Sequence, residues 1–506
     1  MILIHPPVSK PCEPPAGIAR LAGALDCETT PLSIIDANLE GILWAIHGPV
    51  ESNDTWTRRS KKNLQANLEY LQDRKHPWDI DRYTRAVMDI NRLLGKSMQQ
   101  NGIQVSLSNY QDETLSPLKS RDLIRIAEEY EKNPFCTYFR DRLVPQLSGT
   151  NNSHVGISLN FLSQALITFS MIGYLRKEHP GVKVILGGGL VTSWIKRPGW
   201  KNPFGGLVDD MVAGPGEGYL RDLMGMNRSE GQGRPRYDKF PLKHYLSPGG
   251  ILPYSASSGC YWQKCLFCPE KAEGNPYSSL SVDQVLLDLE SLIKQHHPVL
   301  IHFLDNAMSP SLLKQLIARP LAVPWYGFIR MTDHFKDPDF CIGLKKSGCV
   351  MLKIGIESGD QTVLDQLQKG VELESVSISL RNIKMAGIGT YLYFLFGTPP
   401  EGPLEARNTL DFVKRHNKEI DFLNLAIFNM PIHGPDAERY DPSEFYEGDL
   451  SLYSSFRHPK GWDRGVVRAF LNNEFKKDPA IRAIVKRNPP FFTSNHAAFF
   501  MRFNCQ

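Results

Sequence analysis

The stretch Ser255–Glu270, SASSGCYWQKCLFCPE, is the most informative part of the sequence, and the other motifs are interpreted in relation to it. It places three cysteines, Cys260, Cys265 and Cys268, within nine residues, directly after an apolar run that is typical of a β-strand. Thiolates are soft ligands that suit iron–sulfur clusters or zinc, and this spacing lets one loop surround a single metal centre. Three cysteines would leave one iron of a [4Fe–4S] cluster without a protein thiolate. An open position of this kind is typical of a reactive metal site.

A closed structural metal site is the main alternative. A zinc ribbon needs a second CxxC or HxxxH pair, and neither Cys341 nor Cys349 forms one. A two-cluster ferredoxin would need a longer CxxC run, which the sequence also lacks. Three buried cysteines that lie together by chance are a third interpretation. Of these, the spacing favours a metal site.

The composition limits the class of protein. A chain of 506 residues allows two or three domains, and 42% hydrophobic with 22% charged residues is ordinary for a globular protein. The net charge of +4 gives no reason to expect a nucleic-acid partner. No apolar run reaches the ~18 residues of a membrane span, and the amino-terminal residues lack the pattern of a signal peptide. Nine cysteines in such a chain predict a reducing, cytoplasmic location.

The amino-terminal part of the chain alternates strands and helices. Expected strands are 1–4, 31–36, 155–159, 182–186 and 208–212, and expected helices include 16–25, 163–178 and 219–224. This alternation predicts a Rossmann-like α/β domain with a parallel sheet covered on both faces. Ligands of such sheets bind beyond the carboxyl ends of the strands, where the glycine-rich turns at 187–189 and 214–218 fall. The apolar spacing within residues of about 41–151 predicts a mostly helical insertion. This insertion either shapes substrate access or is purely structural.

A polar segment, 227–249, separates this part from a second alternation of strands and helices. The expected strands are 251–255, 300–304, 325–331, 350–356, 391–396 and 422–428, with helices at 281–295, 310–318, 338–347, 361–367, 373–386 and 403–416. Six βα units over ~180 residues predict a partial (β/α)6 barrel, because eight units take ~250 residues. Polar residues at the carboxyl ends of these strands are therefore candidate site residues. The expected boundaries are 1–226, 227–249, 250–440 and a small C-terminal extension, 441–506.

The motifs from the cysteines onward resemble those of radical S-adenosylmethionine (SAM) enzymes, and IGIESG at 354–359 and FGTPPE at 396–401 are characteristic of the cobalamin-type members. The cysteine loop has four residues and then two between its cysteines, where the usual pattern has three and then two. By this resemblance the metal ligands of a [4Fe–4S] cluster are Cys260, Cys265 and Cys268. The residues that would contact SAM are Phe267, Asp305, Arg330, Glu357, Ser358, Gly359 and Gly397.

Roles for these side chains follow from the groups that SAM presents. Glu357 could accept hydrogen bonds from the ribose hydroxyls or the amine, and Ser358 could add a ribose contact. Arg330 could bind the carboxylate as a bidentate fork, and Asp305 would be an acceptor near the amine. Glycines such as Gly397 would let the backbone approach the ligand. A strand-end cap or an ion pair is the structural alternative for each of these polar residues.

The amino-terminal part resembles the cobalamin-binding domain that precedes the barrel in this subclass, over about 1–40 and 150–225. The residues that carry the resemblance are Pro6-Pro7, a strand ending in Asp36, VGIS at 155–158, GGG at 187–189 and GPGEG at 214–218. The implied cobalamin contacts are Ser158, Asn160, Gly187, Gly188, Gly189, Gly216 and Glu217. The pattern DxHxxG is absent, so no histidine ligand to cobalt is expected from this chain. A domain that binds a nucleotide, or nothing, is the alternative.

The resemblance implies a cobalamin-dependent radical SAM enzyme. Such an enzyme cleaves SAM to a 5′-deoxyadenosyl radical, removes hydrogen from an unactivated carbon and methylates a small-molecule, lipid or peptide substrate from methylcobalamin. It needs an electron donor such as flavodoxin or ferredoxin. Two alternatives are kept: a cyclase or rearrangement enzyme that uses cobalamin without methyl transfer, and a non-catalytic metal-binding scaffold.

Overall fold

The computed structural model describes most of the chain. The described residues are 1–25, 32–52, 54–73, 79–100, 102–143, 145, 154–197, 199–226, 233–247, 249–432, 434, 437–440, 443–444 and 448–491. They form two compact units. The first unit comprises the described residues between 1 and 250, together with 448–452 and 490–491. The second unit comprises the described residues between 251 and 444, together with 453–489. Among these residues, no helix has both the length and the apolar composition needed to cross a membrane.

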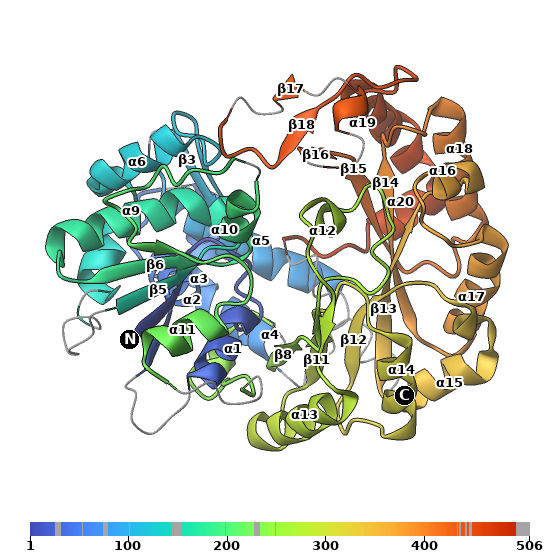
Figure 1. The fold of residues 1–506 in the computed structure, drawn as a ribbon, viewed down its shortest axis with the longest axis horizontal. Helices are drawn as coiled ribbons and strands as arrows, with labels where there is room; N and C mark the ends of the chain where they lie inside the picture. The colour runs from blue at the N-terminus through green and yellow to red at the C-terminus, as the bar shows by residue number, and fades with distance from the viewer. Residues whose placement is uncertain are drawn as a thin grey trace. The chain divides into compact units, whose positions relative to one another are not determined.

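The first unit contains a five-stranded parallel sheet with the strand order β2-β1-β5-β6-β7. Figure 1 labels β5 and β6 of this sheet. Its strands are β1 (Ile2–His5), β2 (Ser33–Asp36), β5 (His154–Ser158), β6 (Lys183–Gly187) and β7 (Asp210–Met211). β1 is buried along its whole length because it pairs with β2 on one side and with β5 on the other. The strand order reverses between β1 and β5, and ligands of such sheets bind at the carboxyl ends beside that reversal. β7 is shorter than the predicted strand because it pairs only with Ile185 and Leu186 of β6.

Helices connect these strands and cover the sheet. They are α1 (Ala16–Ala24), α2 (Ala37–Ile46), α9 (Leu162–Glu178), α10 (Gly189–Ile195) and α11 (Glu217–Leu223). α9 is buried on almost every side, because α6 (Ser120–Glu128) of the insertion packs against it at Gly173. A Cβ atom at Gly173 would lie 1.8 Å from the carbonyl oxygen of Ala127. Residues 233–247 of the expected linker also pack on this unit, where the Arg236 N–H donates to the Ala19 carbonyl.

The insertion contains one feature that the sequence did not predict. Its helices are α3 (Thr55–Lys62), α4 (Leu64–Gln72), α5 (Ile80–Ser97), α6 and α7 (Cys136–Tyr138). Between α5 and α6 lies an antiparallel hairpin of β3 (Ile103–Ser106) and β4 (Asn109–Asp112). The two four-residue strands, IQVS and NYQD, carry too few apolar residues to show the period of two that identifies a strand.

The second unit contains a six-stranded parallel sheet with the strand order β8-β11-β12-β13-β14-β15. Its strands are β8 (Ile251–Tyr254), β11 (Leu300–Phe303), β12 (Trp325–Ile329), β13 (Cys349–Glu357), β14 (Gly389–Phe396) and β15 (Phe422–Ile427). The helices that connect them are α13 (Val282–His296), α14 (Pro310–Ala318), α15 (Pro338–Lys346), α16 (Gln361–Gln366), α17 (Leu373–Met385) and α18 (Pro403–Arg415). The prediction of a mixed α/β protein with parallel sheets is confirmed.

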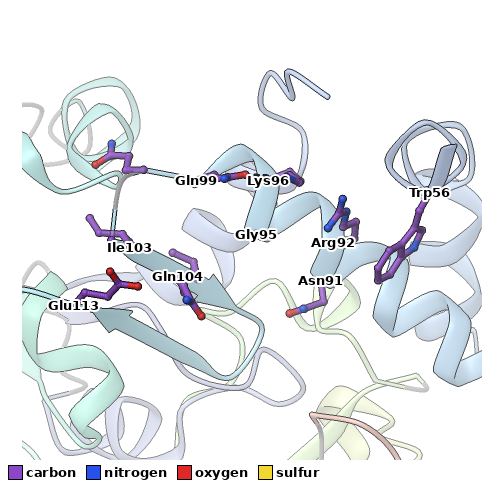
Figure 2. A pocket seen from close by; sticks show the side chains of 12 residues that line it. Trp56, Asn91, Arg92, Gly95, Lys96, Gln99, Ile103, Gln104 and Glu113 are labelled. Carbon is purple, nitrogen blue, oxygen red and sulfur yellow. Dashed lines mark hydrogen bonds between the residues drawn. The ribbon is translucent and has the colours of Figure 1, made fainter. Parts of the chain in front are cut away.

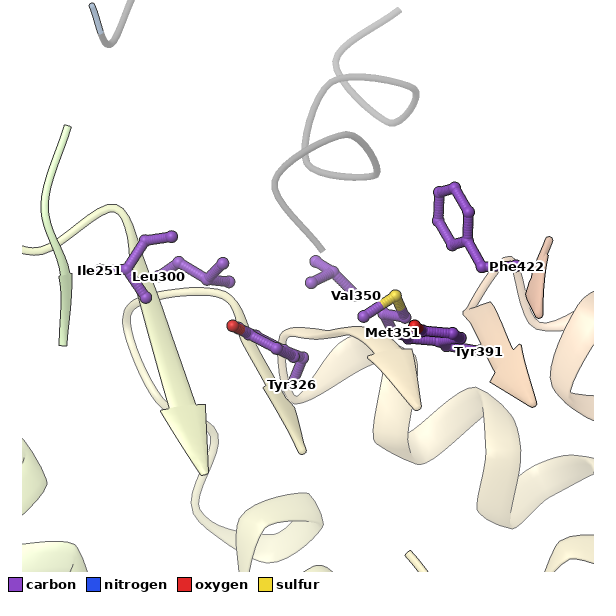
Figure 3. Packing of buried hydrophobic residues seen from close by; sticks show 7 residues of the cluster. All are labelled: Ile251, Leu300, Tyr326, Val350, Met351, Tyr391 and Phe422. Atoms are coloured by element: carbon purple, nitrogen blue, oxygen red, sulfur yellow. The ribbon is translucent and has the colours of Figure 1, made fainter. Parts of the chain in front are cut away.

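The two ends of this second sheet differ in chemistry. At the amino ends of the strands, apolar and tyrosine side chains form one buried cluster (Figure 3), made of Ile251, Leu300, Tyr326, Val350, Met351, Tyr391 and Phe422. Each strand contributes to it, so the cluster closes that end of the sheet. The charged candidate residues lie at the opposite, carboxyl end. The fold thus separates a packed end from an end that can hold a ligand.

Smaller elements complete the second unit. The short strands β9 (Ser257–Ser258) and β10 (Ser278–Ser279) pair antiparallel on either side of α12 (Pro269–Ala272). After β15 come β16 (Met430–Pro431), β17 (Ser443–Glu444), β18 (Tyr453–Ser455), α19 (Arg464–Asn473) and α20 (Pro479–Val485). These belong to the expected C-terminal extension and to the end of the expected barrel. Residues 492–506 of that extension lie outside the described part of the chain.

Candidate metal and cofactor site

The three cysteines lie in the loop between β9 and α12, just beyond the carboxyl end of β8. Cys260, Cys265 and Cys268 are all half-buried, and none forms a disulfide. Gly259 enters the loop with a φ of +69°, and a Cβ atom there would lie 2.4 Å from the carbonyl oxygen of Pro276. Glycine is therefore required where the chain turns from β9 toward the first cysteine.

Asp305 and Asn306, which follow β11, hold the start of this loop. The buried Asp305 carboxylate accepts hydrogen bonds from the Ala256 N–H at 3.1 Å and from the Ser257 hydroxyl at 2.5 Å. The Asn306 amide donates to the Gly259 carbonyl at 3.4 Å. Burial raises the pKa of Asp305, and these hydrogen bonds act against that rise. In this structure Asp305 therefore supports the cysteine loop.

Arg330, which follows β12, contacts the middle of the cysteine loop. Its guanidinium carbon lies 3.6 Å from the ring centroid of Trp262, and its Nη2 donates to the Gly370 carbonyl at 2.5 Å. The Trp262 Nε1–H donates to the Gln368 carbonyl at 3.3 Å. The Leu266 N–H, near the end of the loop, donates to the Leu367 carbonyl at 3.1 Å. The cysteine loop is thus docked on the segment between α16 and α17.

Glu357 ends β13 in an unusual backbone conformation. Its φ is +73°, which residues other than glycine rarely adopt, and the register of β13 on β14 shifts between Gly355 and Glu357. The bulge directs the carboxylate to the Lys369 ammonium, with Oε1 and Nζ 2.9 Å apart. Both side chains are mostly buried, with exposed fractions of 14% and 10%. Lys369 Nζ also lies 5.6 Å from the ring centroid of Phe267, beside the last cysteine.

Ser358 and Gly359 lie against helix α18. The Ser358 and Thr409 hydroxyls are 3.3 Å apart, and the Gly359 N–H donates to the Thr409 hydroxyl at 2.9 Å. A Cβ atom at Gly359 would lie 2.6 Å from Cβ of Phe412. The structure therefore uses both residues to fix the end of β13 on α18.

The FGTPPE turn after β14 closes on itself. The Gly397 N–H donates to the Glu401 carboxylate, and the Trp462 indole N–H donates to the same oxygen at 3.0 Å. Glu401 is 1% exposed, and burial raises its pKa to about 8. Gly397 has a φ of +79° and lines a cavity of about 290 Å³. The other lining residues are Ile427, Phe428, Asn429, Ser454, Ser455, Phe456, His458, Trp462, Asp463, Arg464 and Gly465.

Phe267 connects the cysteine loop to the same region. It packs against a buried cluster that contains Phe428, Met430 and Ala437, at the end of β15 and beyond it. The sequence predicted an aromatic residue that contacts a cofactor at this position. In the structure the ring lies between the cysteine loop and the residues that follow the last strand, on the side of the sheet that carries the cavity.

Two of the thiols are under opposing influences on their pKa. Burial raises the pKa of Cys265, while the nearby Lys369 ammonium and Arg330 guanidinium act to lower it. Burial also raises the pKa of Cys268, and hydrogen bonds from the Lys271 and Glu270 N–H groups act to lower it. Both sets of contacts favour the thiolate, the form that binds metals.

The residue types of the loop are those that a cluster requires. Among the residues that the structure describes, no three Cys, His, Asp or Glu side chains are assembled around one metal-ion position. In a [4Fe–4S] cluster the three thiolates would bind three different irons, so their sulfur atoms do not need to meet at one point. Three thiols on one loop, with two cations beside them, are a donor set that fits a negatively charged cluster.

The carboxyl edge of the first sheet brings together the candidate residues of β5 and β6. The side-chain Oδ1 of Asn160 accepts from the Gly189 N–H at 3.0 Å, and its side-chain Nδ2 donates to the Ser158 hydroxyl at 3.1 Å. Gly187 ends β6, and Gly188 follows with a φ of +106°. A Cβ atom at Gly188 would lie 2.4 Å from the carbonyl oxygen of Leu159. These residues form one tightly packed turn at the edge where the resemblance places cobalamin.

Gly216 and Glu217 lie at the start of α11, apart from that turn. The Glu217 carboxylate forms an ion pair with Arg20 of α1 at 2.7 Å. A Cβ atom at Gly216 would lie 3.4 Å from the Leu21 side chain, which is an ordinary contact. In this structure Glu217 joins two helices.

A second cavity, of about 470 Å³, lies in the insertion between α3, α5 and the β3–β4 hairpin (Figure 2). Its lining includes Trp56, Arg92 and several amide side chains. Arg92 pairs with Asp54 at 2.9 Å and stacks on Trp56, while the Trp56 indole N–H donates to Asp89. The insertion therefore satisfies these groups internally, and we assign this cavity no part in the candidate site.

The sequence did not single out Trp262 within the cysteine loop. It also did not single out Lys369 and Gly370, which contact residues of that loop. The only available signal was the pair Lys369-Gly370 in the break between the two expected helices 361–367 and 373–386. Contacts between residues far apart in the chain made them part of the site, and the spacing of one sequence does not reveal such contacts.

Comparison with known proteins gives distant relatives. No protein-family model matches the chain. An uncharacterized methyltransferase of Pyrococcus horikoshii is 24% identical over 203 residues, which are 38% of this chain and 43% of that protein. The anaerobic magnesium-protoporphyrin IX monomethyl ester cyclase of Rubrivivax gelatinosus is 24% identical over 232 residues, 42% of this chain and 41% of that protein. The chain spans about two fifths of the length of these curated relatives.

One solved structure shares the fold over most of the chain. It is the radical S-adenosylmethionine methyltransferase TsrM from Kitasatospora setae, with cobalamin and a [4Fe–4S] cluster bound. The TM-score is 0.52 at 15% identity, over 87% of this chain and 77% of that one. The chain thus shares its fold with a radical SAM methyltransferase that binds cobalamin, and its curated relatives are named as a methyltransferase and a cyclase.

Proposed function

We propose that this chain is a cobalamin-dependent radical SAM enzyme that methylates an unactivated carbon of a small-molecule, lipid or peptide substrate. The observation that carries the proposal is the docked cysteine loop. Three half-buried thiols lie beyond the carboxyl ends of a six-stranded parallel sheet, beside Arg330, Lys369 and Glu357. Similarity to a protein named as a methyltransferase supports methyl transfer.

The domain assignment is part of this proposal. We assign residues 250–440 to a partial (β/α)6 radical SAM barrel, and 441–506 to a C-terminal extension. We assign 1–226 to a Rossmann-like cobalamin-binding domain with an insertion at about 41–151, joined through 227–249. The shared fold with the cobalamin-containing neighbour supports this order along the chain. An electron donor such as flavodoxin or ferredoxin, in a reducing cytoplasm, completes the proposed setting.

When bound, a reduced [4Fe–4S] cluster would supply the electron that cleaves SAM, and cobalamin would carry the methyl group. The residues of the chain would bind and orient these groups. Arg330 has five N–H groups, of which the bond to Gly370 uses one, so others can bind the SAM carboxylate. Glu357 holds Lys369 through Oε1, which leaves Oε2 to accept from the ribose or the amine of SAM. The 290 Å³ cavity beside Gly397 offers room for part of a ligand at the same sheet end.

The remaining candidates would act by fixing these groups in place. Asp305 would hold the start of the cysteine loop, and Ser358 and Gly359 would hold the end of β13 through α18. In the first unit, the glycines 187–189 would let the backbone approach the corrinoid nucleotide, and the Asn160 side chain would hold this turn through Gly189. Glu217 would support this edge through its ion pair with Arg20.

The test is anaerobic reconstitution of the full-length chain with iron, sulfide and hydroxocobalamin. We expect a full [4Fe–4S] complement, bound corrinoid, and cleavage of SAM to 5′-deoxyadenosine or S-adenosylhomocysteine. Zinc at the cysteines without SAM cleavage would establish the metal-binding scaffold instead. An iron–sulfur protein that cleaves SAM but binds no corrinoid would remove the cobalamin part of the proposal.

A second candidate reaction is cyclisation or rearrangement with cobalamin and without methyl transfer. The similarity to the Rubrivivax gelatinosus cyclase favours it. The two reactions differ in products, because methyl transfer consumes the methyl group of SAM whereas cyclisation returns it in methionine. SAM labelled with deuterium in its methyl group, followed by mass spectrometry of the substrate, distinguishes them.

A further inference from the structure

The loop between Cys260 and Cys265 carries the extra residue, and the structure shows how it is accommodated. Gln263 takes a left-handed conformation with a φ of +51° and is exposed. This turn leaves the preceding residue, Trp262, lying against the body of the second unit. The ring centroid of Trp262 lies 3.6 Å from the guanidinium carbon of Arg330 and 4.8 Å from Nζ of Lys264. Its ring therefore has two cationic neighbours.

The segment after α16 is shaped to receive this ring. Gly370 has a φ of +64°, and a Cβ atom there would lie 2.5 Å from Cζ2 of Trp262 and 3.0 Å from Nη2 of Arg330. The carbonyls of Gln368 and Gly370 accept from the indole N–H and from Arg330 respectively. The absence of a side chain at Gly370 is thus what permits the ring and the guanidinium to stack at this place.

From this arrangement we propose that Trp262, Arg330 and Gly370 form a clamp that fixes the cysteine loop in its ligand-binding conformation before the cluster is inserted. Trp262 is a positioning residue for the metal centre, acting through the loop that carries Cys260 and Cys265. Each contact of the clamp is made by protein groups alone. The inference rests on the proposed function.

The clamp also gives Arg330 a second task. The guanidinium bridges the loop and the segment after α16, and it lies near enough to Cys265 and Cys260 to interact with their charges. A fixed positive charge at this position offsets the negative charge that three thiolates bring to a cluster. Removing the clamp should therefore both loosen the loop and change the spectroscopic signature of any bound cluster.

Substitutions separate the parts of the clamp. Trp262→Ala removes the ring and its hydrogen bond, whereas Trp262→Phe keeps an aromatic face for Arg330 and loses only the N–H donor. Gly370→Ala introduces a Cβ atom into the position of the ring and leaves every charged group and cysteine unchanged. Gly461→Ala is the matched control, because Gly461 has the same φ of +64° and no atom within 4 Å of its Cβ position.

The measurement is hydrogen exchange of the metal-free, full-length protein, followed by mass spectrometry of peptides that cover 260–268. In Trp262→Ala and Gly370→Ala we expect exchange in this segment, including the Leu266 amide, to be roughly tenfold faster, since a cation–π contact and a hydrogen bond are lost. Trp262→Phe should give a smaller increase, and Gly461→Ala should match the wild type. Wild-type exchange in both Trp262→Ala and Gly370→Ala would overturn the clamp.

A second measurement ties the clamp to metal binding. After anaerobic reconstitution, the clamp variants should release iron to a chelator roughly tenfold faster than the Gly461→Ala control, with a shifted electron paramagnetic resonance signal. Iron release and signal identical to those of the control would overturn the positioning role. A wild-type protein that takes up no iron and sulfide would instead refute the proposed function, while the exchange experiment still decides whether the clamp exists.

Discussion

The carboxyl edges of the two parallel sheets use different means to build a candidate site. At the second sheet, side chains from several strand ends contact one another: Asp305 holds the cysteine loop, Arg330 stacks on it, and Glu357 pairs with Lys369. At the first sheet a glycine-rich turn forms the edge, in which the Asn160 side-chain oxygen accepts from the Gly189 N–H and Gly188 packs on the Leu159 backbone. The first edge depends on glycines that let the backbone pack closely, whereas the second depends on charged side chains. Mutations should therefore affect the two edges in different ways.

The largest expected effect follows from removing one thiolate. Cys265→Ala should lower iron retained after reconstitution roughly 100-fold and abolish SAM cleavage, since a cluster with two thiolates is held weakly. Corrinoid binding should not change, because the first edge is intact. Cys136→Ala, at a half-buried cysteine of the first unit, is the control for cysteine removal. Full iron content in Cys265→Ala would place the metal elsewhere.

The first edge is best tested by adding a single methyl group. Gly188→Ala combines a φ of +106° with a Cβ atom 2.4 Å from the Leu159 carbonyl, so the turn must move. We expect a loss of about 3–4 kcal/mol in the free energy of unfolding and weak corrinoid binding, with iron uptake retained. The control is Gly206→Ala, which has a φ of +84° and no atom within 4 Å. Corrinoid titration of both variants decides whether the turn contacts the cofactor.

Breaking the ion pair of the second edge should lower the free energy of unfolding by a smaller amount, and a second mutation should partly reverse this loss. Lys369→Met leaves the mostly buried Glu357 carboxylate without its partner, which should cost about 3 kcal/mol in the free energy of unfolding. The double variant Glu357→Gln and Lys369→Met removes both charges and should recover part of this loss. Urea unfolding of the two single variants and the double variant gives the coupling. Additive losses would show that the pair contributes nothing to this edge.

The last effect concerns pH and is small per pH unit. Burial raises the pKa of Glu401 to about 8 from 4.5, so the folded protein keeps a proton that the unfolded chain releases. The resulting stabilisation is complete below pH 4.5 and is lost as the pH rises to about 8, at about 1 kcal/mol per pH unit. The neighbouring carboxylates Glu405 and Asp360 act in the same direction as burial.

Glu401→Gln should remove this slope, because the amide oxygen can still accept from Gly397 and Trp462 while nothing titrates there. The check is urea unfolding of both proteins at about pH 5.5, 7 and 8.5. Parallel pH profiles for the wild type and the variant would show that Glu401 is ionised in the folded protein.

The sequence predicted the repeating parts of the molecule well. Each strand of the second sheet lies within two residues of its expected position at either end, because apolar runs bounded by glycine and capping residues define such strands locally. The expected polar residues also lie at the carboxyl ends of these strands. The β3–β4 hairpin was missed because its strands are short and polar.

What the sequence did not predict is how the site residues are engaged. The sequence predicted that Ser358 and Gly359 contact the ligand, and it did not predict that both bond to Thr409 or that Gly359 packs on Phe412 of α18. The stacking of Arg330 on Trp262 depends on two loops that meet only in three dimensions. The left-handed backbone conformation of Glu357 could not be predicted from residue preferences, because residues other than glycine rarely adopt it.

The support of the cysteine loop has a consequence for engineering. Residues 256–268 look like a portable motif, yet the loop is held by Asp305 after β11, by Arg330 after β12 and by the segment Leu367–Gly370 after α16. A cysteine stretch that is transplanted alone into another protein with a parallel sheet would lack these contacts. A chimera that is to assemble a cluster must therefore import the second and third βα loops of this sheet and the segment between α16 and α17 together with the first βα loop.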